Sequence, residues 1–113
     1  MESNSNKQDK DSYCVVLCAC PGDEIAESLA GALVKNRLAA CVQIMPIRSF
    51  YEWEGKIHRD EELLLFIKTR NALYQQLEDF ISKNHPYEVP EIVLIPMRNG
   101  LDKYLNWIDS VTL

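Results

Sequence analysis

The sequence contains no long hydrophobic run. Nowhere do about eighteen apolar residues follow one another, and this excludes an α-helical membrane span. The first twelve residues hold no apolar side chain after Met1, so the apolar segment of a secretory signal peptide is missing. We therefore expect a cytoplasmic protein that has no membrane partner and keeps its four cysteines as reduced thiols.

Basic residues are too few for a nucleic-acid-binding surface. Twelve Lys and Arg stand against seventeen Asp and Glu, which gives a formal net charge of -5. Binding to a phosphate backbone depends on clustered positive charge. The composition thus predicts that nucleic acid is not a partner.

Known enzyme motifs are missing as well. The chain has no Gly-x-Ser-x-Gly, no Walker phosphate loop, no Gly-x-Gly-x-x-Gly and no His-Glu-x-x-His. A nucleophile pair of Cys18 or Cys41 with His85 would need a third residue to orient it, and none is identifiable. The sequence therefore favours a protein that is not an enzyme.

What is present is the pattern of one small domain. The length of 113 residues fits a single domain. The polar composition of residues 1–12 predicts a disordered tail, which leaves one domain over 13–113. The order βαββαβ, followed by an extra C-terminal helix, predicts an α+β fold, the ferredoxin-like sandwich. The spacing of apolar residues predicts four strands, over residues 13–19, 39–54, 57–69 and 92–95. It predicts three helices, over residues 23–37, from an N-cap at Asn71 to Pro86, and over residues 101–108.

The predicted hairpin around Gly55 is longer than the domain that carries it. Each of its strands could extend to about 45 Å at roughly 3.3 Å per residue, whereas a domain of about 100 residues has a radius of gyration near 13 Å. Pro46 restricts its first strand to a sheet edge or a bulge. Phe50, Tyr51 and Trp53 would be exposed unless a second copy of the chain paired along this edge, so we expect a homo-oligomer.

Three cysteines fall on one face of the first predicted strand. Cys14, Cys18 and Cys20 alternate with the other residues of the strand, so their side chains point the same way. Thiolates favour Cu(I) and zinc, which allows a soft-metal site. Cysteine is also one of the most often buried residues, and these three could simply pack in the core. The spacing leaves both interpretations open.

His85 precedes Pro86 at the end of the second predicted helix. Imidazole there could ligate copper or zinc, or it could interact with the helix dipole at the C-terminus. The other histidine, His58, and the acidic run of residues 60–62 are expected to form a solvated surface.

Five short sequence motifs give the chain a resemblance to a known family. These motifs are Arg37-Leu38-Ala39-Ala40-Cys41, Tyr51-x-Trp53-x-Gly55-Lys56, Lys68-Thr69, His85-Pro86-Tyr87-x-x-Pro90-Glu91 and Tyr104-Leu105-x-Trp107. They fall in family order, and the resemblance covers residues 13–110. On these motifs the chain resembles the divalent-cation-tolerance proteins called CutA.

The resemblance implies a cytoplasmic homotrimer that binds copper, as Cu(I) or Cu(II), or other divalent cations. It places Cys18 and His85 at the family's proposed copper ligands. Asn84 stands where those relatives have a further histidine, and an amide is a poorer copper ligand than imidazole. Cys20 offers an additional thiol on the face of Cys18.

The resemblance also extends, in fold and trimeric form, to the PII signalling proteins. It therefore implies an alternative function, a binding module that holds a small ligand or a partner protein in its intersubunit clefts. The candidate cleft residues are Trp53, Glu62, Lys68, Tyr87 and Glu91.

Overall fold

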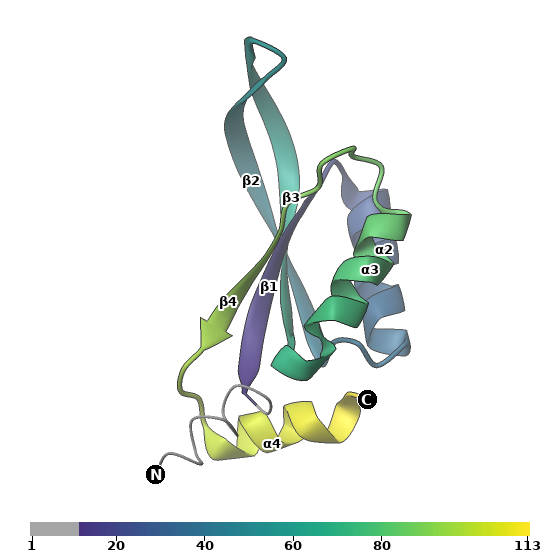
Figure 1. Cartoon of the computed structure of the whole chain (residues 1–113), viewed down its shortest axis with the longest axis vertical. Helices are drawn as coiled ribbons and strands as arrows, with labels where there is room; N and C mark the ends of the chain where they lie inside the picture. Colours follow the sequence, from purple (N-terminus) through teal and green to yellow (C-terminus); the bar gives the residue numbers. More distant parts are fainter. Residues whose placement is uncertain (1–11) are drawn as a thin grey trace.

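A computed structural model describes residues 12–113, so all but the last residue of the tail expected over 1–12 lies outside the described residues. Within the described part the chain forms four strands and four helical elements in the expected order (Figure 1). The elements are β1 (Tyr13–Cys20), α2 (Asp23–Lys35), β2 (Cys41–Trp53), β3 (Lys56–Arg70), the 3-10 turn η1 (Asn71–Leu73), α3 (Tyr74–Asn84), β4 (Ile92–Met97) and α4 (Asp102–Val111).

The four strands form one antiparallel sheet in the order β2-β3-β1-β4. β1 is central, and its Val16 pairs with Ile67 of β3 and Leu94 of β4. Pro46 lies in β2, at the edge of the sheet. A proline has no N–H to donate, and an edge strand tolerates this better than a central strand does. The expected ferredoxin-like α+β fold is confirmed.

Helices α2 and α3 lie on the same face of the sheet (Figure 1). The alternate residues of β1 that face them, Cys14, Val16, Cys18 and Cys20, are fully buried. Burying one large apolar side chain stabilises the fold by roughly 1.5–3 kcal/mol. Leu65 and Ile67 of β3 complete this layer, against a helical set of Leu29, Leu33, Leu77 and Ile81.

The hairpin of β2 and β3 extends beyond the rest of the domain (Figure 1). Its turn places Glu54 at φ 52° and Gly55 at φ 80°, and two consecutive left-handed residues match the twist of the strands they join. The molecule measures 50 × 29 × 24 Å, with a radius of gyration of 15.3 Å. Phe50 is 68% exposed at this end, so the expected overhang is present.

Two local expectations are wrong. Asn71 does not cap α3, because residues 71–73 first form a 3-10 turn and the Asn71 amide instead donates to the Ser12 hydroxyl. Glu62 is not part of a solvated acidic face, because it is buried and its carboxylate accepts a hydrogen bond from the Tyr87 hydroxyl at 2.7 Å. Both corrections arise from contacts between residues far apart in the sequence.

Ser12, the last residue of the expected tail, is attached to the domain. Its carbonyl accepts from the Asn71 N–H at 2.9 Å, and its hydroxyl accepts from the Asn71 amide at 2.6 Å. We expect removal of residues 1–11 to leave Tm unchanged, since Ser12 keeps both bonds. S12A in the shortened chain should lower Tm by about 4 °C, because one hydrogen bond contributes about 1 kcal/mol. Calorimetry checks both, with S28A on the exposed surface of α2 as the control; equal melting of S12A and S28A would contradict the expectation.

Candidate functional site

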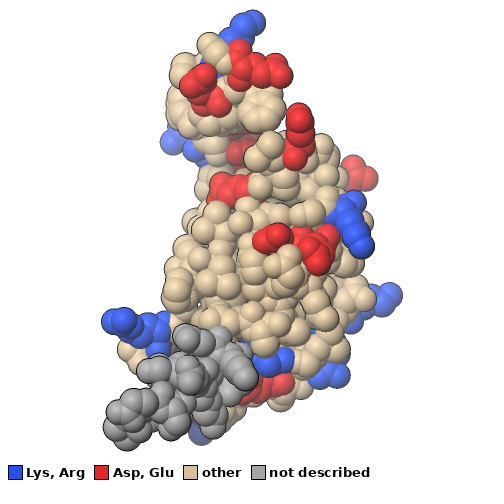
Figure 2. Space-filling model, in the orientation of Figure 1, with Lys and Arg blue, Asp and Glu red and all other residues tan. Residues whose placement is uncertain are grey.

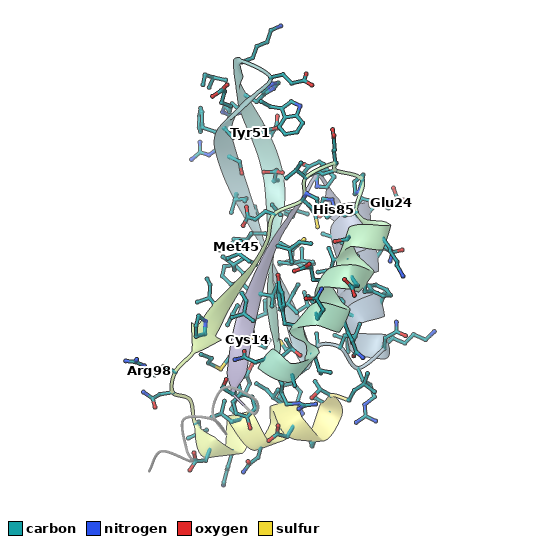
Figure 3. All side chains as sticks on the ribbon, viewed as in Figure 1. Cys14, Glu24, Met45, Tyr51, His85 and Arg98 are labelled. Atoms are coloured by element: carbon teal, nitrogen blue, oxygen red, sulfur yellow. The ribbon has the colours of Figure 1, made fainter. Side chains whose placement is uncertain are left out.

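A buried cluster of metal-ligating side chains lies where β1 ends beside the end of α3. The Sγ atoms of Cys18 and Cys20 and a ring nitrogen of His85 all lie within 4.8 Å of one another. β1 supplies both thiols on its helix-facing side, and the end of α3 supplies the imidazole (Figure 3). The structure thus brings together the two residues proposed as metal ligands from the resemblance.

Both ring nitrogens of His85 already have hydrogen-bond partners. The Tyr87 N–H donates to Nδ1 at 3.1 Å, so Nδ1 carries the lone pair. Nε2 therefore carries the proton and donates it to the carbonyl oxygen of Ala19 at 2.8 Å. The imidazole joins the end of the central strand to the loop that follows α3.

The two thiols are coupled to each other. Cys18 donates a hydrogen bond to Cys20, and this bond, burial and the negative charges of Cys20 and Glu91 raise the pKa of Cys18. The same bond lowers the pKa of Cys20, against the opposing effects of burial and of Glu62. Removal of a proton from one thiol therefore disfavours removal of the second, because the two neighbouring sulfur atoms interact.

The donor set suits a soft metal ion. Two thiols and one imidazole match Cu(I) or zinc, whereas magnesium, calcium and manganese prefer oxygen ligands. Sulfur and nitrogen ligands of one zinc or copper ion stand about 3.5–4 Å apart, and the present separations of up to 4.8 Å are near this range. To hold such an ion the cluster needs a contraction and a ring nitrogen of His85 that is released from its hydrogen bond.

A pocket of about 770 Å³ opens next to this cluster, between the hairpin and the loop that joins α3 to β4. Four of the five expected cleft residues line it: Trp53, Glu62, Tyr87 and Glu91. The fifth, Lys68, lies farther along β3, where its ammonium donates to the Gln43 side chain at 2.7 Å. In Figure 3, Tyr51 marks the hairpin side of this region and His85 the domain side.

The sequence alone did not indicate every residue of the thiol–imidazole cluster and of the pocket. The strand spacing predicted a common face for Cys14, Cys18 and Cys20, but only Cys18 and Cys20 lie in the cluster with His85. The carbonyl of Ala19, which accepts from His85, has no signal in the sequence at all. Tyr51 was expected only as an exposed aromatic, yet it lines the pocket and its hydroxyl donates to Asp60.

The bridge made by His85 should stabilise the fold without any metal. We expect H85F to lower the free energy of unfolding by about 2 kcal/mol, because two hydrogen bonds are lost and the buried Ala19 carbonyl and the partly buried Tyr87 N–H stay unpaired. Urea unfolding at one protein concentration, in the presence of a chelator, measures this. N84A serves as the neighbouring control, and it should cost less than about 0.5 kcal/mol because Asn84 is exposed. An H85F variant as stable as N84A would show that the bridge has no structural role.

Comparison with known proteins agrees with this fold. The family model described as CutA1 divalent ion tolerance protein matches residues 14–111. Human Protein CutA is 44% identical over 102 residues, which cover 89% of this chain and 57% of that protein. The divalent-cation tolerance protein CutA of Thermus thermophilus is 45% identical over 99 residues, covering 87% of this chain and 96% of that protein.

Solved structures give the same result. The crystal structure of CutA1 from Oryza sativa superimposes with a TM-score of 0.89 at 42% identity, covering 93% of this chain and 97% of that one. The Thermus thermophilus structure superimposes with a TM-score of 0.86 at 44% identity, covering 88% and 98% of the two chains.

The relatives differ in length and in the location that their names give. The chain spans 54% to 58% of the mouse, human, Arabidopsis and cattle proteins. The Arabidopsis thaliana protein is named chloroplastic, and the Archaeoglobus fulgidus structure is described as a periplasmic protein. Within residues 12–113 no helix is long and apolar enough to cross a membrane. Since the family model covers nearly the whole described domain and relatives above 40% identity extend over most of it, the chain belongs to the CutA1 family of divalent ion tolerance proteins.

Proposed function

We propose that this protein is a homotrimer that binds copper at Cys18, Cys20 and His85 and thereby contributes to tolerance of divalent metals. Family membership supports the role in divalent ion tolerance. The identity of the metal, the ligands and the trimer are the proposed part. The family description names no reaction, and we propose a binding function rather than an enzymatic one.

One observation carries the metal site, the convergence of two thiols and an imidazole within 4.8 Å in a buried place. Cys18 and Cys20 are fully buried and His85 is 9% exposed, so water competes poorly for an ion held there. Two thiolates and one imidazole make a three-coordinate set that suits Cu(I). Other thiophilic ions, zinc among them, would use the same atoms.

Metal binding at this site has a cost in protons and in hydrogen bonds. Both thiols must lose their protons, so affinity should weaken as pH falls. His85 must also give up one of its two partners, either the Ala19 carbonyl or the Tyr87 N–H, to free a ring nitrogen. Because the thiols must stay reduced, we propose the cytoplasm as the place of action.

The ligand set predicts a specific pattern of Cu(I) affinities. C18S and C20S should each weaken Cu(I) binding by at least about tenfold, and H85A should weaken it less, because loss of the imidazole also removes the cost of breaking its hydrogen bonds. N84H should strengthen binding if its ring reaches the ion. Competition with a chromophoric Cu(I) chelator under anaerobic conditions measures these affinities.

C41S is the matched control for the thiol variants. Cys41 is a free cysteine at the start of β2, where it pairs with Lys68 near the C-terminal end of β3. Cys18 and Cys20 pair with β3 at Leu65 and Leu63. Loss of the Cys41 thiol should therefore leave the Cu(I) affinity unchanged. Unchanged affinity in both C18S and C20S would sink the metal site and leave these residues as core packing.

The trimer is supported by an apolar sheet face that none of the helices described within residues 12–113 covers. α2 and α3 pack on the opposite face (Figure 1). Val93 and Ile95 of β4 and Met45 of β2 are 48%, 43% and 46% exposed there. Val15 and Leu17 of β1 lie between them, in register with Ile95 and Val93. Apolar strands exposed in this way mark an interface, and further copies of the chain would cover them.

Light scattering tests the trimer. We expect about three times the 13.0 kDa chain mass at micromolar concentration. V93D should shift the protein toward monomers, since it places a charge in the buried interface. V34D is the control, because Val34 is 44% exposed on α2 and an added charge there stays in water. A wild-type mass of one chain would contradict the proposal.

A second candidate function is a PII-like binding module, in which the pocket beside the hairpin holds a small ligand. The observation that favours it is the meeting of Trp53, Glu62, Tyr87 and Glu91 around one cavity of about 770 Å³. Ligand sites in proteins have volumes of roughly 300–1,000 Å³. Metal binding and ligand binding involve different atoms, so the protein could do both.

A further inference from the structure

The pocket beside the hairpin combines aromatic walls with negative charge. Tyr51 and Trp53 contribute from the hairpin and Tyr87 from the loop after α3. The charged side chains that line it are all carboxylates, Glu62, Glu88 and Glu91, and none of the described lining residues is basic. Figure 2 shows acidic side chains on the hairpin and on the domain just beneath it.

Glu62 is the most informative of these residues. It is only 8% exposed, and among the described residues it has one hydrogen-bond donor, the neutral Tyr87 hydroxyl, and no ion pair. A buried carboxylate is costly unless a positive charge or several donors compensate it. The lining of this pocket supplies neither, so a ligand that brings both would be held strongly.

The tyrosine hydroxyls report the same negative potential. Burial raises the pKa of Tyr87, and its hydrogen bond to Glu62 and the charge of that carboxylate raise it further. The pKa of Tyr51 is raised chiefly by its hydrogen bond to Asp60. The imidazole of His58 stacks on Tyr51 with ring centroids 5.4 Å apart, and His58 is not among the residues that line the pocket.

We propose that this pocket binds a small organic cation that carries a guanidinium group. This inference rests on the second candidate function, the small-ligand site, and is independent of the metal site.

Guanidinium fits both features of the pocket. Its plane stacks on the faces of tyrosine and tryptophan rings. Its N–H groups form paired, charge-assisted hydrogen bonds with a carboxylate, which Glu62 of β3 and Glu91 of the loop before β4 both offer. A ligand with an aromatic or aliphatic body beyond the guanidinium would cover the apolar part of the lining, Val89 and Pro86 included.

Two probes of the same shape test the charge requirement. Benzylguanidinium carries the cation, and benzylurea is its neutral counterpart. We expect benzylguanidinium to bind the full-length protein at least about tenfold more tightly, because charge-assisted hydrogen bonds are the stronger kind. Titration calorimetry gives the affinities. Fluorescence in a W107F background reports from Trp53 alone, since the chain has two tryptophans.

Variants assign the binding to the pocket. E62Q keeps an acceptor for the Tyr87 hydroxyl but removes the charge, and it should weaken benzylguanidinium binding about tenfold while leaving benzylurea unchanged. E91Q, at an exposed position, gives the same test without risk to folding. E27Q on the exposed surface of α2 is the matched control and should have no effect.

The outcomes separate the cation proposal from the two functions above. Equal binding of both probes would overturn the cation proposal and keep the small-ligand site. Binding of neither probe, as when a neighbouring copy covers the pocket in the trimer, would overturn both. Copper affinity in E27Q should match the wild type. E62Q removes a charge that acts on Cys20, so copper binding is measured separately and the comparison of the two probes alone decides the cation proposal.

Discussion

The hydrogen bonds of the His85 ring hold the functional end of this molecule together. One ring nitrogen donates to the carbonyl of Ala19 at the end of the central strand, and the other accepts from the N–H of Tyr87. The first bond sets the end of α3 against the two thiols of β1. The second orients the loop whose Tyr87 forms the wall of the pocket. The cluster of two thiols and one imidazole is therefore a neighbour of the pocket, because the His85 ring connects them.

The proposed metal site would give His85 a second role that competes with the first. As a bridge it needs both nitrogens for hydrogen bonds, and as a ligand it needs one of them for a metal. Metal binding would loosen either the strand contact or the loop contact. Glu91 adds a second link, since it lines the pocket and its charge raises the pKa of Cys18. A ligand in the pocket and an ion at the thiols would thus act on the same small set of groups.

The same sheet serves three surfaces. Its helix-facing side holds the core and the thiols, its open side presents the apolar strands of β1, β2 and β4, and its overhanging hairpin supplies Tyr51 and Trp53 to the pocket. Period-two alternation separates the first two surfaces residue by residue. The extra length of β2 and β3 creates the third, because only a hairpin that extends past β1 can face the loop after α3.

The sequence by itself determined the order of the elements, the exclusion of Pro46 from a regular central strand, and the common face of the three β1 thiols, because each follows from local spacing and backbone geometry. Only the tertiary structure decided where those faces meet. The burial of Glu62 under Tyr87, the attachment of Ser12 to Asn71 and the distance from His85 to Cys20 each join residues from different elements. Such contacts depend on how helices and strands pack, and spacing along the chain carries no information about a partner more than twenty residues away in another element.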